Sequence, residues 1–226
     1  MCFSANASFG AGIVLSVIGV AAIKKVQHPS QILFASIPLL FAVQQISEGI
    51  LWLTLANPAY TVLSQVMTHV FLFFAQFFWP LWVPIAILML EREDKRKKIQ
   101  KILVGIGIFV ALFSAYSLLT YHVQAKIIGY HVTYSVDYPN PLGRFSGIFY
   151  FIATVIPPFF SHIKRMWMFG TTIFISYLIT AIFYDHYLVS VWCFFASIIS
   201  ISIYAIMIEI RNMNKKAFST DNLYIN

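Results

Sequence analysis

The sequence predicts an all-α fold, a polytopic membrane protein built as a bundle of seven transmembrane helices with its N-terminus outside and its C-terminus in the cytoplasm. Composition is the first observation behind this prediction. Of the 226 residues, 60% are hydrophobic and 10% are charged, whereas an ordinary soluble domain is about half apolar and about a quarter charged. The second observation is that the apolar residues form seven runs, each near or above the length of about 20 residues that a membrane-crossing helix needs.

The seven runs account for nearly the whole chain. They cover residues 6–23, 31–56, 60–90, 99–121, 144–162, 167–184 and 187–209. No Lys or Arg precedes the first run, so the positive segment of a cleavable signal peptide is missing and we expect this run to remain as a helix. In the third run, Pro80 and Pro84 remove backbone donors and are expected to bend the helix in its cytoplasmic half. Residues 1–216 thus form one transmembrane domain, and residues 217–226 form a polar cytoplasmic tail.

The basic residues predict the orientation. Thirteen of the 15 Lys and Arg residues follow the first, third, fifth or seventh run, and only Lys126 and Arg144 lie on the other side. Because cytoplasmic loops carry the excess of Lys and Arg, these four connections are expected in the cytoplasm. The net charge of +7 therefore reflects topology. It does not indicate a nucleic-acid partner, because the basic residues are not interleaved with stacking aromatic residues.

The longest outer loop covers about residues 122–143 and contains a Pro-Asn-Pro sequence at residues 139–141. Its β-branched and aromatic residues alternate with polar ones, which is typical of a short hairpin lying over the outer mouth of the bundle. The same pattern is typical of an aromatic segment that rests at the lipid interface. The sequence leaves both interpretations open.

Polar residues inside the runs are the candidates for function, because ionisable side chains in hydrocarbon are costly and usually face the bundle interior. At about 1.5 Å per residue, Glu48 lies about 12 Å and His69 about 14 Å inside the outer ends of their helices. These depths predict a polar pocket that opens outward. The expected pocket residues are Gln44, Gln45, Glu48, Gln65, His69, Gln76, Asp185 and His186.

Two kinds of chemistry suit such a pocket. Glu48 and His69 are able to exchange protons or to ligate a metal. Cys2 and Cys193 also belong to the outer half of the bundle, where a thiol pair can be oxidised; a disulfide, metal ligation and no pairing all remain open. Together, Cys2, Glu48, His69 and Cys193 are ligand types that suit tetrahedral zinc. Retinal is not expected, because the last run has no lysine to form a Schiff base.

Hydroxylated residues at helical spacing have a simpler interpretation. Thr172, Ser176 and Thr180 follow one another at steps of four, and Ser190 begins a similar series in the seventh run. Small residues in such stripes more often indicate tight helix packing than a ligand site.

Four segments carry recognisable motifs. They are the opening Met1-Cys-Phe-Ser, Gln44-Gln45-Ile-Ser-Glu48-Gly49, Trp79-Pro-Leu-Trp-Val-Pro84 and Ser190-Val-Trp-Cys-Phe-Phe-Ala196. Together they resemble a family of small bacterial membrane proteins of unknown function, over nearly the whole chain. The resemblance implies a multi-pass protein of the bacterial inner membrane and no particular activity. It also implies that the following residues belong to family motifs: Cys2, Glu48, Trp79, Pro80, Trp192 and Cys193.

Three functions remain open at this point. The polar pocket favours a protein that binds or translocates a small solute, ion or lipid, with Glu48 and His69 carrying charge or protons. The second interpretation is a membrane-embedded, metal-dependent enzyme that acts on a lipid or small molecule, with Glu48 as general base or ligand. The third is a structural or assembly protein whose polar stripes only pack helices. The sequence does not predict the oligomeric state.

Overall fold

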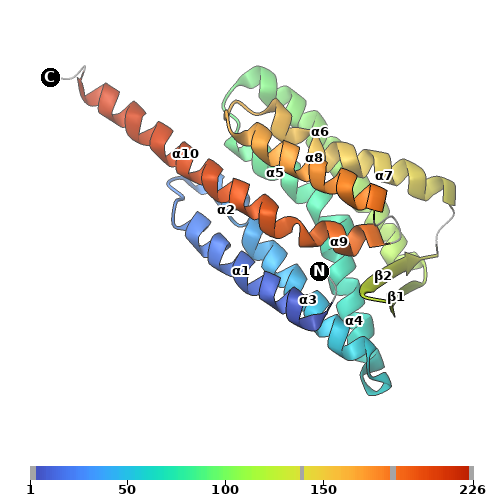
Figure 1. Ribbon diagram of the computed structural model, residues 1–226. Coiled ribbons are helices and arrows are strands. Elements are labelled where there is room, and N and C mark those ends of the chain that lie inside the picture. Colours follow the sequence, from blue (N-terminus) through green and yellow to red (C-terminus); the bar gives the residue numbers. More distant parts are fainter. Residues whose placement is uncertain (1–3, 138–139, 184–186, 224–226) are drawn as a thin grey trace.

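The computed structural model describes residues 4–137, 140–183 and 187–223, and most of them are helical (Figure 1). The helices are α1 (Ala5–Ile23), α2 (Ile32–Ala35), α3 (Ile37–Leu55), α4 (Thr61–Leu72), α5 (Trp79–Leu90), α6 (Asp94–Thr120), α7 (Asn140–Val155), α8 (Met166–Phe183), α9 (Leu188–Phe194) and α10 (Ala196–Leu223). The strands are β1 (Val123–Ile128) and β2 (His131–Val136). A π-helical turn, η3 (Phe73–Phe78), joins α4 to α5, and short 3-10 turns cover Pro29–Gln31, Pro58–Tyr60 and Pro157–Phe160.

Five of the predicted runs form helices that are long and apolar enough to cross a membrane. They are Ala5–Ile23, Pro29–Leu55, Pro58–Leu90, Asp94–Thr120 and Met166–Phe183. The fifth run contains a shorter apolar helix, Gly147–Phe160. The seventh run is not one continuous helix, because α9 ends at Phe194 and α10 begins at Ala196. Since α10 continues to Leu223, the first part of the expected tail is helical.

The outer loop forms a β-hairpin, which confirms one of the two interpretations of its sequence and adds two strands to a fold predicted as all-α. The strands pair antiparallel. Gly129 closes the turn with a φ of 61°, a conformation that residues with a Cβ rarely adopt. The hairpin packs on the bundle through buried Val123 and Val132, and the Tyr134 ring stacks on Phe71 of α4 at 4.6 Å between centroids.

Glycines let α1 and α3 approach closely. A Cβ on Gly19 of α1 would lie 2.6 Å from the Leu39 side chain, and one on Gly49 of α3 would lie 2.7 Å from the Phe9 ring. Close packing of this kind stabilises helix pairs in lipid, where the hydrophobic effect does not drive helices together. The main apolar core lies among α2, α5, α8 and α10.

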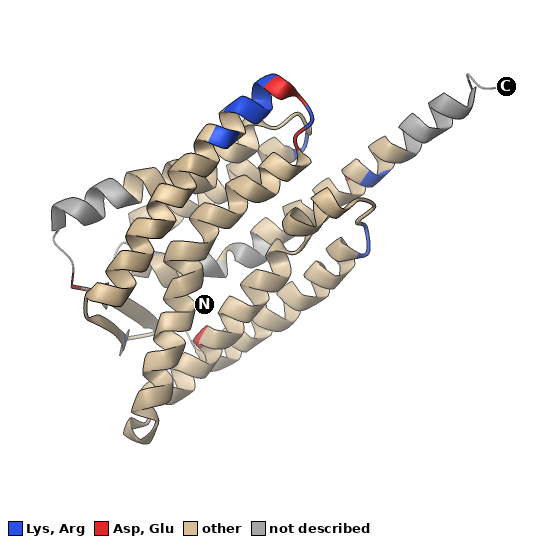
Figure 2. Ribbon diagram, turned by 180° about the vertical axis from the view of Figure 1, so that it is seen from behind, with Lys and Arg blue, Asp and Glu red and all other residues tan. Residues whose placement is uncertain are grey.

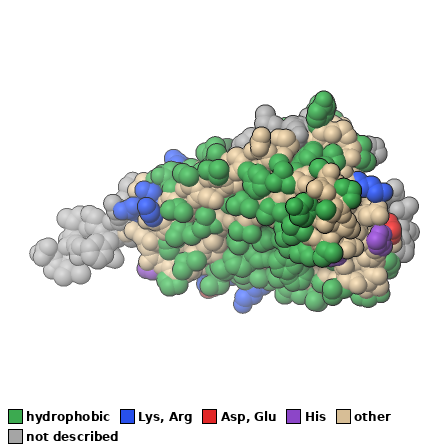
Figure 3. Space-filling model, turned by 90° about the horizontal axis from the view of Figure 1, so that it is seen from below, with side chains coloured by type: hydrophobic (Ala, Val, Ile, Leu, Met, Phe, Trp, Pro, Cys, Tyr) green, Lys and Arg blue, Asp and Glu red, His purple; other side chains and the backbone are tan. Residues whose placement is uncertain are grey.

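The outside of the bundle is apolar, and its charges gather at one end. Figure 3 shows hydrophobic side chains over most of one face, and Val62, Leu119 and Ile182 are each at least 70% exposed. Such a surface suits contact with lipid. Most described Lys and Arg residues lie at the end where α5 meets α6 and where α1 ends, away from the hairpin (Figure 2). We call these two ends the basic end and the hairpin end.

Candidate functional site

Glu48 of α3 is completely buried at the hairpin end, where it joins three elements. Its Oε1 accepts hydrogen bonds from Ser190 Oγ of α9 at 2.6 Å and from the Tyr134 hydroxyl of β2 at 3.4 Å. On the same helix, Gln45 Nε2 lies 3.5 Å from Glu48 Oε2. The carboxyl group therefore connects α3 with the hairpin and with α9. Glu48 thus faces the bundle interior.

These described partners of Glu48 suit both of its protonation states. Hydroxyl groups donate and accept, so Ser190 and Tyr134 can contact either a carboxylate or a carboxylic acid. The Gln45 side chain is also completely buried, and its Oε1 has no hydrogen-bond partner within the described part of the chain. Because a side-chain amide can turn its oxygen and nitrogen about, Gln45 is able to donate to a charged Glu48 or to accept from a protonated one.

Gln44 makes a second buried contact between helices. Its Oε1 accepts a hydrogen bond from Trp79 Nε1 of α5 at 2.7 Å. Phe41 of α3 stacks on the same indole ring, with 3.8 Å between centroids. A buried indole N–H normally requires such a partner, so Gln44 acts here as a packing residue that couples α3 to α5.

The irregularity of the third span, Pro58–Leu90, lies in η3, just before its first proline, Pro80. In η3, the Trp79 N–H bonds to the carbonyl of Phe74, five residues earlier. With the same spacing of five residues, the Ala75 carbonyl would pair with the backbone nitrogen of Pro80, which has no N–H. The Tyr150 hydroxyl of α7 donates to this carbonyl instead, at 2.6 Å. The proline thus creates a free acceptor, and α7 supplies its donor.

Among the described residues that were predicted for the pocket, Gln65 and His69 do not join Glu48 in the bundle interior. Gln65 and His69 are exposed, and His69 Nδ1 lies 2.8 Å from the Gln65 carbonyl oxygen in its own helix. Gln76 is half-buried in η3. Glu48 and His69 are therefore not brought together, because one is buried and the other faces away from the bundle.

The zinc prediction falls mostly on residues that are not described. Cys2, Asp185 and His186 lie outside the described residues, as does the side chain of Cys193. Within the described ranges, no group of three or more His, Cys, Asp or Glu side chains lies close enough to hold a metal ion. The two expected ligands that are described, Glu48 and His69, do not converge.

Ser190 and Tyr134 are the site residues that the sequence did not identify. Ser190 belongs to a stripe that predicted helix packing, yet it donates to a carboxylate 142 positions away in the chain. Its place in the motif of residues 190–196 is the one signal that could have singled it out. Tyr134 carries no such signal, because its contact with Glu48 depends on the register of the hairpin.

A second buried carboxylate, Glu91, lies at the basic end just after α5. Its Oε1 accepts hydrogen bonds from the backbone N–H groups of Arg92 and Glu93, both at 3.0 Å, and from His162 Nδ1 at 2.8 Å. Its Oε2 accepts from the His162 N–H at 2.9 Å. Burial raises the pKa of Glu91. The N–H groups and the His162 charge together lower it by more than burial raises it, so the pKa lies below its usual value of 4.5. Sequence reasoning missed this group because it follows the end of an apolar run.

Nearly the whole described chain falls within one known family. A model described as a family of unknown function (DUF6629) matches residues 1–218. This match confirms the resemblance to an uncharacterised family. No curated protein and no solved structure matches the chain.

Proposed function

Because the chain belongs to this family of unknown function, which brings no activity with it, we propose a function from the Glu48 site. The protein binds or translocates a small solute, ion or lipid through a polar pocket at the hairpin end, and Glu48 is the group that exchanges protons. It is a multi-pass protein of the bacterial inner membrane, with seven spans, its N-terminus outside and its C-terminus in the cytoplasm.

The topology part of this proposal has two supports. The positive-inside rule assigns the basic end to the cytoplasm and the hairpin to the outside. Five apolar helices have the length to span, and the remaining two crossings are α7 with the turn after it and α9 with the first part of α10. An odd number of crossings puts the two termini on opposite sides.

One observation carries the functional part: a completely buried glutamate within a span, held by partners that suit both of its protonation states. An ionisable side chain at this depth is costly and usually serves a function. Tyr134 reaches Glu48 from the hairpin, so displacement of the hairpin removes one of its contacts and opens a route from outside. Proton exchange at Glu48 is then coupled to the closure of the pocket.

The second candidate function is a membrane-embedded enzyme, and the short contact between Ser190 Oγ and Glu48 Oε1 favours it. In that case Glu48 acts as a general base toward the Ser190 hydroxyl. Substitution of Ser190 by Ala abolishes such an activity, whereas solute translocation tolerates it with reduced affinity. The structural or assembly role is favoured if Ser190→Ala and Glu48→Gln both keep every phenotype.

The proposal is tested by infrared difference spectroscopy of the purified protein during a pH step, which detects the carbonyl band of a protonated carboxyl group. We expect a band from a buried carboxylic acid that disappears in Glu48→Gln. Proteoliposomes on a solid-supported membrane then report charge movement after pulses of inorganic cations, amino acids or sugars, and this current is also lost in Glu48→Gln.

Glu209→Gln is the matched control. Its carboxylate is mostly buried and pairs with Arg165 at 3.8 Å at the basic end, so the same substitution there should leave the band and the current unchanged. A band that survives in Glu48→Gln, or that is lost equally in both variants, contradicts proton exchange at Glu48.

A further inference from the structure

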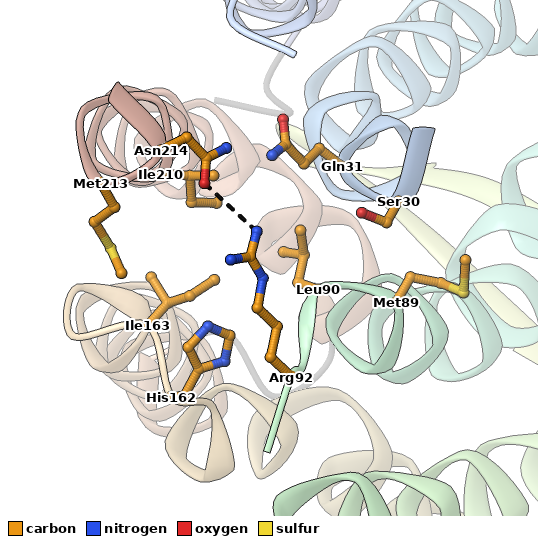
Figure 4. A pocket seen from close by; sticks show the side chains of 10 residues that line it. All are labelled: Ser30, Gln31, Met89, Leu90, Arg92, His162, Ile163, Ile210, Met213 and Asn214. Atoms are coloured by element: carbon orange, nitrogen blue, oxygen red, sulfur yellow. Dashed lines mark hydrogen bonds between the residues drawn. The ribbon is translucent and has the colours of Figure 1, made fainter. Parts of the chain in front are cut away.

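The basic end contains a pocket that is separate from the Glu48 site. It has a volume of about 260 Å³ and lies among four segments: the turn before α2, the end of α5, the segment before α8, and α10 (Figure 4). Leu90, on its wall, is the last residue of one apolar span. The pocket therefore lies at the level where the chain leaves the hydrocarbon.

The polar wall of this pocket is built to meet an anion. Arg92 extends into it, and its Nη2 makes one long hydrogen bond of 3.4 Å to Asn214 Oδ1 (Figure 4). Gln31 is only 2% exposed, and its Oε1 accepts the Gln27 N–H at 2.8 Å. Its amide nitrogen is thus left as the group that faces the pocket. Ser30 adds a hydroxyl to the same wall.

No carboxylate among the described residues lines the pocket. Glu91 lies behind His162 and is already bonded to N–H groups. The other described acidic residues of this end are paired with cations at 2.6 to 3.8 Å: Glu93 with Arg96, Asp94 with Lys97, and Glu209 with Arg165. Arg92 is therefore the charged side chain that a ligand meets first among the described lining residues, and it favours an anion.

The wall opposite Gln31 and Ser30 is apolar. It consists of Met213, Ile163 and Ile210, whereas Met89 lies beside Ser30 (Figure 4). Met89 and Met213 are 50% and 45% exposed. A pocket with a cationic wall, an apolar wall and a position at the membrane surface fits an amphiphile. Its volume is below the range of about 300–1,000 Å³ of pockets for drug-sized ligands, so it suits a phosphate with a small attached group.

We propose that this pocket binds a phosphate ester through Arg92, Gln31 and Ser30, with the apolar wall receiving the carbon chain next to the phosphate. Guanidinium groups bind phosphate oxygens through paired N–H donors. An anionic phospholipid of the surrounding membrane and a soluble phosphate ester share this chemistry, and the experiment below separates them. The proposal does not depend on proton exchange at Glu48, which lies at the other end of the molecule.

Native mass spectrometry of the detergent-purified full chain tests the proposal, with phosphatidylglycerol or phosphatidylcholine of the same acyl chains added in steps. We expect tighter binding of phosphatidylglycerol, and about a tenfold weakening in Arg92→Gln, as expected for the loss of one charge-assisted contact. Ser30→Asp, which puts a carboxylate on the same wall, should weaken binding at least as much. Lys98→Gln removes the same charge from an exposed residue nearby and should change binding less than twofold.

A soluble ligand is tested by adding glycerol 3-phosphate to the same samples. Displacement of phosphatidylglycerol by millimolar glycerol 3-phosphate supports the pocket with a soluble ester as its ligand, and retention of the lipid supports the phospholipid. Equal weakening in Arg92→Gln and Lys98→Gln overturns the proposal, because it shows attraction to the basic end as a whole. Unchanged binding in both Arg92→Gln and Ser30→Asp also overturns it.

Discussion

The protein buries two glutamates, one near each end, and the groups that surround them differ in kind. Within the described part of the chain, Glu91 at the basic end accepts hydrogen bonds from N–H groups alone, namely three backbone N–H groups and the Nδ1 of the His162 ring. Glu48 at the hairpin end contacts the hydroxyls of Ser190 and Tyr134 and the amide of Gln45. An N–H group can only donate, so it stabilises a carboxylate and opposes its protonation.

This difference separates a structural carboxylate from a candidate functional one. The N–H groups around Glu91 favour its charged form, and Glu91 ties the loop after α5 to the segment before α8. The described partners of Glu48 can hydrogen-bond to it in its charged and in its protonated form, which is what a proton-exchanging group requires. Burial is shared by both residues, so burial alone does not indicate function; the donor and acceptor character of the partners does.

Removal of the Glu91 side chain should have the largest effect on stability. In Glu91→Ala, three backbone N–H groups and the His162 ring N–H lose their acceptor, and a buried donor left without a partner typically costs about 1–3 kcal/mol. We expect a decrease of about 3 kcal/mol in the free energy of unfolding, measured by chemical unfolding in detergent. Glu93→Ala, at a neighbouring side chain that is 55% exposed, is the control and should change stability little. Similar losses in both variants would show that the Glu91 contacts are not structural.

Acid should weaken the basic end through the same residue. Because the pKa of Glu91 is lower in the folded chain than its usual 4.5, folding favours the charged form. The stability that results is complete above pH 4.5 and is lost as the pH falls through the folded-state pKa. The thermal unfolding midpoint of the wild type should therefore decrease as the pH is lowered below 4.5. In Glu91→Gln, the midpoint should decrease less over the same pH range. An identical pH profile in the two proteins contradicts this assignment.

Hydropathy predicted the long apolar helices, because span length is a local property of the sequence. The break between α9 and α10 and the π turn before Pro80 were not predicted, since both depend on how helices pack. Glu48 was found because a carboxylate in an apolar run is visible without any structure. The prediction for His69 used helix rise, which gives the depth of a residue but not the side of the helix on which it lies. In the structure, His69 lies on an exposed side of α4.

The partners of Glu48 and the pocket at the basic end lay beyond the reach of the sequence for a different reason. Tyr134 and Ser190 come from elements 86 and 142 positions away from Glu48. Arg92 meets Asn214 across 122 positions. No local pattern encodes such pairs, whereas the motif of residues 44–49 contains Glu48, the residue that Tyr134 and Ser190 both contact.

The substitution Glu48→Gln should cost less stability than the same change at Glu91. The hydroxyls of Ser190 and Tyr134 can reorient toward an amide, so the contacts persist and we expect a loss below about 1 kcal/mol. In Glu91→Gln, by contrast, an amide N–H₂ group would face backbone N–H donors, and the loss should be larger. Chemical unfolding of the two variants side by side measures the difference. If Glu48→Gln costs as much as Glu91→Gln, Glu48 is a structural carboxylate and the proton-exchange proposal loses its basis.

The smallest effect is expected for Tyr134→Phe, which removes only the hydroxyl that reaches Glu48. Its hydrogen bond is long, at 3.4 Å, and the ring can keep its stacking on Phe71, so the loss of stability should be about 0.5 kcal/mol. Amide hydrogen exchange in β1 and β2 should become faster while exchange in α5 stays the same. The hairpin would then be a weakly held cover over Glu48, as an opening pocket requires. A loss near that of Glu91→Ala would instead show that the hairpin end, like the basic end, is clamped by its buried carboxylate.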